Sequence, residues 1–132
     1  MLAWLFGEEA GSHAAEELGH ADFVTASDLT LLECDRSLIR AVTRSLIPEG
    51  RAARLRATLA RTAAHWRLMP ISREIVRRAR QPFPGEPIRS LGAIHLASAL
   101  AAADTLPDFA VLSLDHRLRA AGMRLGLRML PG

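Results

Sequence analysis

The side chains best suited to chemistry stand on two short segments in the second half of the chain. Residues 89–100 open with Arg89 and carry His95 within a run of alanines and leucines, which predicts a helix with a polar head. Residues 109–114 form an apolar run typical of a buried strand, and Asp115 follows it directly. An arginine can contact a phosphate, and an imidazole can act as a base or a ligand. With a carboxylate at the strand end, these two segments predict an α/β site.

Each of these residues also has an ordinary structural interpretation. Asp115 suits the N-cap of the next helix, a role that a ligand carboxylate can fill at the same time. Ser113 would point to the same side of the strand as Asp115, where it could bind a phosphate oxygen or a metal-bound water, or be a simple strand hydroxyl. The alternative for Arg89 is a surface arginine. For His95 a structural role in its helix is the preferred interpretation.

The elements that must position these side chains alternate between helix and strand. Such an order predicts a parallel sheet covered on both faces, with functional groups at the carboxyl ends of the strands. The expected strands are residues 22–26, 68–71, 109–114 and 127–130, and the expected helices include residues 8–18, 73–80, 89–103 and 115–122.

Two further helices lie between the first two strands. The first is expected to begin at a cap on Ser27 or Asp28 and to bury one stripe of side chains. That stripe comprises Leu29, Leu32, Leu38, Ile39 and Val42. The second opens with Pro48 at its first position, and its arginines are interpreted chiefly as a solvated face, with a surface for a partner or RNA as the alternative. These are Arg51, Arg54, Arg56 and Arg61.

Composition limits the class of protein. The chain of 132 residues is long enough for one domain, and 49% hydrophobic with 23% charged residues is typical of a folded globular protein. All 17 residues counted as Lys or Arg are arginine, which permits a polyanionic partner, although coding bias is the preferred explanation. Cys34 is the only cysteine, which excludes an internal disulfide and a cysteine-based zinc site. Without a secretory signal or a membrane-length apolar run, a cytoplasmic protein is expected.

The two segments together resemble a known family. Residues 89–97 read Arg-Ser-Leu-Gly-Ala-Ile-His-Leu-Ala, and Ser113-Leu-Asp115-His-Arg-Leu118 follows the strand. This pattern is similar to that of the PIN-domain nucleases, and most closely to the VapC-type toxins of bacterial toxin–antitoxin pairs. The resemblance implies Mg²⁺-dependent cleavage of RNA phosphodiester bonds, with Mn²⁺ as a possible substitute. It covers nearly the whole chain, residues 1–130.

The resemblance also implies a set of metal-binding carboxylates. Glu33 matches the family's second acidic position and Asp115 its last, with Ser113 beside it as a further catalytic residue. Gly92 stands where the family has a catalytic aspartate, so this position is degenerate. Two of four expected carboxylates are thus present, and ligand number sets the affinity of an oxygen site, so weak metal binding is expected. Arg89 and His95 become possible contacts to RNA or its phosphates.

The fold implied by the resemblance is a single PIN-like domain over residues 1–132, a three-layer α/β/α arrangement around a central parallel sheet. The first, central strand of the family, which carries another aspartate, is not recognised in this chain, and residues 1–6 match the helix that follows it. The expected partners are an RNA substrate, a cognate antitoxin and a second copy of the chain. The alternative function is a catalytically dead PIN-like module that binds an antitoxin or dimerises, with Trp4, Leu5 and Phe6 contributing apolar surface.

Overall fold

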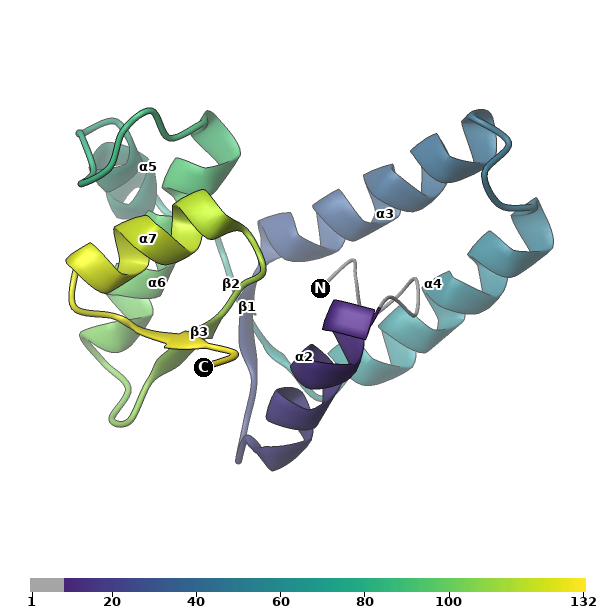
Figure 1. Ribbon diagram of the computed structural model, residues 1–132, viewed down its shortest axis with the longest axis horizontal. Coiled ribbons are helices and arrows are strands. Elements are labelled where there is room, and N and C mark those ends of the chain that lie inside the picture. The colour runs from purple at the N-terminus through teal and green to yellow at the C-terminus, as the bar shows by residue number, and fades with distance from the viewer. Residues whose placement is uncertain (1–8) are drawn as a thin grey trace. The chain divides into compact units, whose positions relative to one another are not determined.

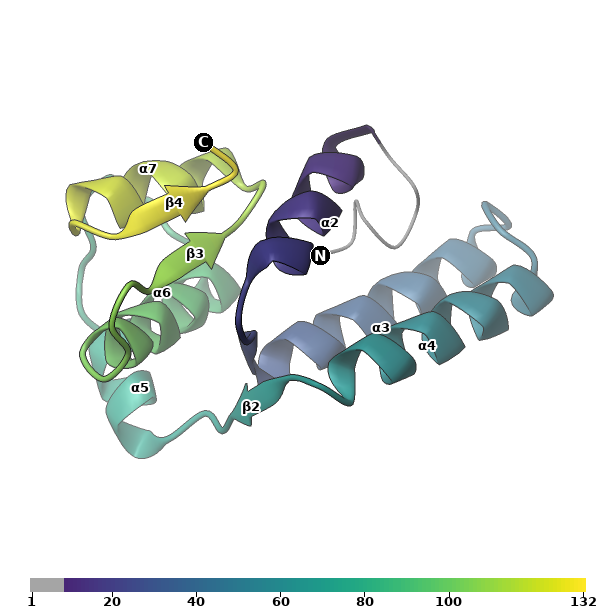
Figure 2. The same ribbon diagram turned by 90° about the horizontal axis from the view of Figure 1, so that it is seen from below.

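The computed structural model describes residues 9–132 (Figures 1 and 2). The chain forms two compact units, the first ending at Leu68 and the second beginning at Met69. The first unit contains α2 (Glu9–His20), β1 (Thr25–Ser27), α3 (Asp28–Thr43) and α4 (Glu49–Ala63), and β2 (Arg67–Met69) follows at the boundary. The second contains α5 (Arg73–Ala79), α6 (Ser90–Ala103), β3 (Ala110–Leu112), α7 (His116–Arg124) and β4 (Arg128–Leu130).

Helices α3 and α4 form an antiparallel hairpin, and both views show them side by side (Figures 1 and 2). Ser27 caps α3, because its hydroxyl accepts a hydrogen bond from the backbone N–H of Leu29 at 3.2 Å. Two apolar clusters hold the hairpin together. One surrounds Leu38 and Ala52, and the other joins Cys34 to Leu59.

The face that α3 buries differs from the predicted stripe. Leu29 and Leu38 are buried as expected, but Leu32 is 55% and Ile39 is 40% exposed. The helix instead packs through Cys34, Leu38 and Ala41, which follow one another at spacings of four and three residues. Leu32 and Ile39 lie about 100° around the helix from Leu31 and Leu38, so a single partner helix cannot cover both faces.

The second unit is built on α6, whose small and apolar residues are buried along most of its length. Its core gathers side chains from α5, α6, α7 and β4, including Ile75, Leu96, Ala97, Leu118 and Met129, around the buried ring of Phe83. Strands β3 and β4 pair in parallel, with Val111 opposite Met129. The predicted α/β class with a parallel strand pair is therefore confirmed.

The strands are shorter than predicted, and they form two two-stranded sheets, β1–β2 and β3–β4. Ladder hydrogen bonds include fewer residues in a strand than an apolar sequence pattern does. Strands β3 and β4 each keep three residues of their expected ranges, whereas β1 ends one residue later and β2 begins one residue earlier than expected. Helix α4 begins at Glu49, with Pro48 as its N-cap and not as its first residue. That the family's central strand is missing from this chain, and that the whole chain forms a single domain, stay predictions. The expected helix end and apolar cluster in residues 1–6 lie outside the described residues.

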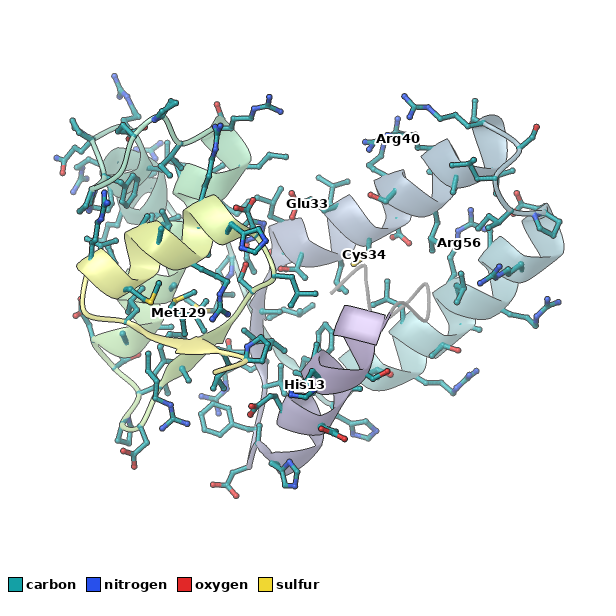
Figure 3. All side chains as sticks on the ribbon, in the orientation of Figure 1. His13, Glu33, Cys34, Arg40, Arg56 and Met129 are labelled. Atoms are coloured by element: carbon teal, nitrogen blue, oxygen red, sulfur yellow. The ribbon has the colours of Figure 1, made fainter. Side chains whose placement is uncertain are left out.

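Gly122 leaves room for the Met129 side chain where α7 packs against β4. A Cβ atom at this position would lie 2.5 Å from the Met129 sulfur, and both residues are buried. Figure 3 shows Met129 between β4 and α7. We expect Gly122→Ala to lower the free energy of unfolding by about 1–3 kcal/mol through overpacking. Urea denaturation measures this, with Gly50→Ala as the control, because the added Cβ there lies 3.8 Å from its nearest neighbour. An unchanged stability in Gly122→Ala would contradict this packing.

Because of the Cys34 thiol, the free energy of unfolding should depend on pH in the alkaline range. Burial raises the pKa of this thiol to about 11. The folded state thus keeps its proton at a pH where the unfolded thiol has lost it, so the free energy of unfolding should fall as pH rises from about 9 toward 11. With no Tyr or Lys in the chain, no other side chain type titrates in this range. We expect the slope to vanish in Cys34→Ala, measured by denaturation at a series of pH values; an equal slope in both proteins would refute this assignment.

Candidate functional site

The carboxylate of Asp115 joins the end of β3 to the start of α7. Its Oδ1 atom accepts hydrogen bonds from the backbone N–H groups of Arg117, at 2.8 Å, and Leu118, at 3.0 Å. Asp115 is therefore the N-cap of α7, as predicted. Both bonds go to the same oxygen, so the cap fixes the orientation of the exposed carboxylate and Oδ2 takes no part in it. The structural and the chemical role of this residue are compatible.

Ser113 lies just beyond β3 and supports the turn into α7. Its hydroxyl oxygen accepts a hydrogen bond from the Asp115 backbone N–H at 3.2 Å, and its own N–H donates to the carbonyl of Leu130 at 3.1 Å. Ser113 thus prolongs the pairing with β4 and shapes the segment that carries Asp115. The hydroxyl hydrogen is not used by this bond and can still be donated to a ligand.

Arg119 holds the ends of both strands of the second unit. Its Nη1 atom donates to the carbonyl oxygens of Ser113, at 3.0 Å, and Leu130, at 2.5 Å, and Nη2 donates to that of Pro131 at 2.7 Å. A guanidinium matches such a set of acceptors because its donors lie in one plane with a fixed spread. The residue therefore fixes the strand end that precedes Asp115.

Gly92 and His95 lie on one face of α6, because residues three apart are neighbours on a helix. Gly92 is the third residue of the helix, and both positions are partly buried. A Cβ atom at Gly92 would lie 3.3 Å from Cγ2 of Ile88, so a side chain there requires only a small shift of a methyl group. The first turn of a helix favours a negative charge through its unpaired N–H groups. Position 92 therefore has room for the aspartate that the motif leads one to expect.

Arg89 is the exposed N-cap residue of α6, and its side chain makes no capping hydrogen bond. The loop before it is held in place by Glu86, whose Oε1 accepts from the Phe83 N–H at 3.0 Å and whose Oε2 accepts from the Ile88 N–H. The guanidinium of Arg78 also stacks on the Phe83 ring, 4.0 Å from its centroid. This arrangement gives α6 and Arg89 a fixed starting point.

Glu33 belongs to the first unit, where it is half-buried on α3 beside the buried Cys34 (Figure 3). The residues predicted from sequence thus fall into two groups. Arg89, Gly92, His95, Ser113 and Asp115 lie in the second unit, on α6 and at the end of β3. Glu33 stands alone among them in the first unit.

The described residues do not fit a resident divalent metal. Across residues 9–132, no group of three or more His, Cys, Asp and Glu side chains is placed to hold a metal ion. Mg²⁺ prefers six oxygen ligands and usually needs carboxylates to anchor it. In the second unit Asp115 is the one carboxylate of the predicted set.

Sequence reasoning missed two residues that position the site, Arg119 and Glu86. Their partners are backbone groups, and those of Arg119 lie up to twelve residues away. Arg119 is one of 17 arginines in the sequence, and its spacing does not distinguish it from the others. Glu86 offered a weak signal, since it stands between a glycine and a proline in a loop where an acceptor can order the backbone.

Replacement of Arg119 should loosen the strand ends more than it disturbs the core. Arg119→Met keeps much of the side-chain bulk but removes the donors to three carbonyl groups, so we expect the free energy of unfolding to fall by about 1–3 kcal/mol. Amide hydrogen exchange should become faster at Ser113, whose N–H pairs with Leu130. Arg128→Met, on an exposed residue of β4, is the matched control. Unchanged exchange at Ser113 would show that the guanidinium does not hold this end.

Within the part of the chain that the structure describes, none of the helices has the length and apolar character needed to cross a membrane. Comparison with protein-family models gives a match to the PIN domain over residues 1–123. No curated protein matches the chain in sequence. The matched range includes α6, the end of β3 and nearly all of α7, the elements that carry the motif residues. The chain therefore belongs to the PIN-domain family, whose members are in general nucleases.

Proposed function

We propose that this chain is a PIN domain of the VapC toxin type, directed at RNA, whose hydrolytic site is incomplete because Gly92 replaces a carboxylate. The observation that carries the proposal is the position of Gly92. It lies in the first turn of α6, on the face that also carries His95, where the family motif has an aspartate. Nothing in the packing requires glycine there, since an added Cβ meets a single methyl group at 3.3 Å.

Each remaining site residue has a proposed role. Asp115 presents a carboxylate whose orientation is fixed by the cap on α7, and Glu33 supplies the second carboxylate. Ser113 holds the turn before Asp115 and offers a hydroxyl donor to a phosphate oxygen. Arg89, exposed at the start of α6, contacts the RNA phosphate, and His95 lines the same helix. Mg²⁺, or Mn²⁺ in its place, would bind only weakly to such a reduced set.

A second candidate is a PIN-family module that binds a protein partner and does not cleave RNA. Two observations favour it. Across residues 9–132, no group of three or more His, Cys, Asp and Glu side chains is placed to hold a metal ion. In addition, Leu32, Ile39 and Leu46 are exposed at intervals of seven residues along α3 and the turn that follows it. An apolar stripe of this kind suits the helix of an antitoxin or a second copy of the chain.

Restoration of the carboxylate separates the two candidates. We expect Gly92→Asp to bind Mn²⁺ at least about tenfold more tightly than the wild type, because one charged ligand is added beside the existing set. Electron paramagnetic resonance of free Mn²⁺ measures the affinity, and a labelled RNA hairpin reports cleavage. Cleavage is expected in Gly92→Asp above the level of the wild type.

Gly92→Asn is the matched control, because it has the same shape as aspartate without the charge. A gain in Gly92→Asp that is lost again in Gly92→Asp/Asp115→Asn would show that the two positions share one ion. If Gly92→Asp is folded by circular dichroism, binds Mn²⁺ no better than Gly92→Asn and leaves RNA intact, the hydrolytic proposal is wrong. That outcome would leave the partner-binding module as the function.

A further inference from the structure

A cavity of about 520 Å³ lies within the first unit, between α2, the end of α4 and the segment that enters β1. Its volume is in the range of ordinary ligand pockets. The walls combine aromatic and cationic side chains, and include Phe23, Arg61, His65 and Trp66. None of these residues belongs to the candidate site described above.

The aromatic wall of this cavity has one fixed and one accessible ring. Trp66 is partly buried and packs against the cluster of Cys34 and Leu59, so its ring is held in place. Phe23 is 52% exposed, and the guanidinium of Arg67 lies 5.5 Å from its centroid. An exposed ring does not gain the free energy that removal of its apolar surface from water would provide, and a ligand that covers the ring would supply this gain. The flat face of a nucleobase is the kind of group that stacks on such rings.

A row of arginines leads along α4 to the cavity. Arg51, Arg54 and Arg61, with Thr58 between them, follow one another at spacings of three and four residues, which places them on one face of the helix. All three arginines are exposed, and they span about 15 Å. A salt bridge joins Arg56 to Glu49 at 2.9 Å, and Arg56, labelled in Figure 3, lies outside this row.

The row and the cavity are therefore complementary to two parts of one ligand. Exposed guanidinium groups bind phosphates and release counterions, whereas aromatic rings stack with bases. Arg61 belongs to both, because it lines the cavity and its Nη2 atom donates to Thr58 Oγ1 at 3.1 Å on the row. Asp22 also lines the cavity, and its carboxylate can accept a hydrogen bond from the ring N3–H of uracil or thymine.

We infer that the first unit binds single-stranded nucleic acid, with phosphates along Arg51, Arg54 and Arg61 and a base in the cavity between Phe23 and Trp66. The binding needs no metal and none of the candidate catalytic residues. It therefore goes beyond the proposed function and can be tested apart from it. Stacking is tolerant of sequence, so the same chemistry accommodates an RNA or a DNA strand.

Fluorescence anisotropy in EDTA tests this surface without interference from cleavage. The probes are 5′-fluorescein-labelled decauridylate and decathymidylate. Tighter binding of decauridylate would identify the ligand as RNA, and tighter binding of decathymidylate would identify it as DNA. We expect Arg54→Gln/Arg61→Gln to reduce the slope of log affinity against log salt by about 1.4, since each phosphate contact to a single strand contributes about 0.7. Arg36→Gln/Arg40→Gln is the matched control, because it removes the same charge from exposed positions of α3 in the same unit. Equal losses in both double variants would overturn the inference.

The cavity is tested through its two rings. Phe23→Leu removes a stacking face but keeps apolar bulk, and we expect it to weaken binding by about 5- to 150-fold, whereas Phe23→Trp should preserve it. In a Trp4→Phe background Trp66 is the sole tryptophan, and saturable quenching of its fluorescence by unlabelled decauridylate is expected. Unaltered affinity in Phe23→Leu, or saturated binding without quenching of Trp66, would overturn the assignment of the cavity.

Discussion

The second unit depends on the hydrogen bonds of one carboxylate. Asp115 ends the strand segment and starts α7, because its Oδ1 atom accepts two backbone N–H groups of the first helical turn. The same residue is the acidic member of the motif in this unit. The cap also fixes the orientation of this side chain. The requirement of the fold and the requirement of the chemistry thus meet in one side chain, with Arg119 and Ser113 fixing the backbone before it.

A nuclease site of this family needs several carboxylates close together, and such a cluster is costly without a cation between its members. In this chain Gly92 offers no carboxylate on α6, and across residues 9–132 no group of three or more His, Cys, Asp and Glu side chains is placed to hold a metal ion. The protein keeps the elements that present the site, namely the fixed start of α6, the strand end and the capped α7. Both proposed functions use this scaffold, and they differ in whether a metal ion can still bind to it.

The sequence predicted the elements of the second unit well, because strong local signals coincide there. Asp115, which follows an apolar strand, was expected to cap the next helix, and the structure contains both hydrogen bonds of that cap. Prediction was poorer where the outcome depends on distant partners. The exposure of Leu32 and Ile39 follows from the single face by which α3 meets α4, and the role of Arg119 follows from carbonyl groups on two strands. The site residues themselves came from the motif, and their assembly with Glu33 stays a prediction.

The proposed function depends most on the proposal that Asp115 and Glu33 act as ligands of one metal site, weakened by Gly92. Paramagnetic broadening of amide signals by Mn²⁺ in the wild-type protein tests it most directly, because the effect depends on distance from the bound ion and not on catalysis. The account predicts that the amides of Glu33 and Cys34 broaden together with those of Arg117 and Leu118, at the same Mn²⁺ concentration. Broadening at one of these segments without the other would contradict it.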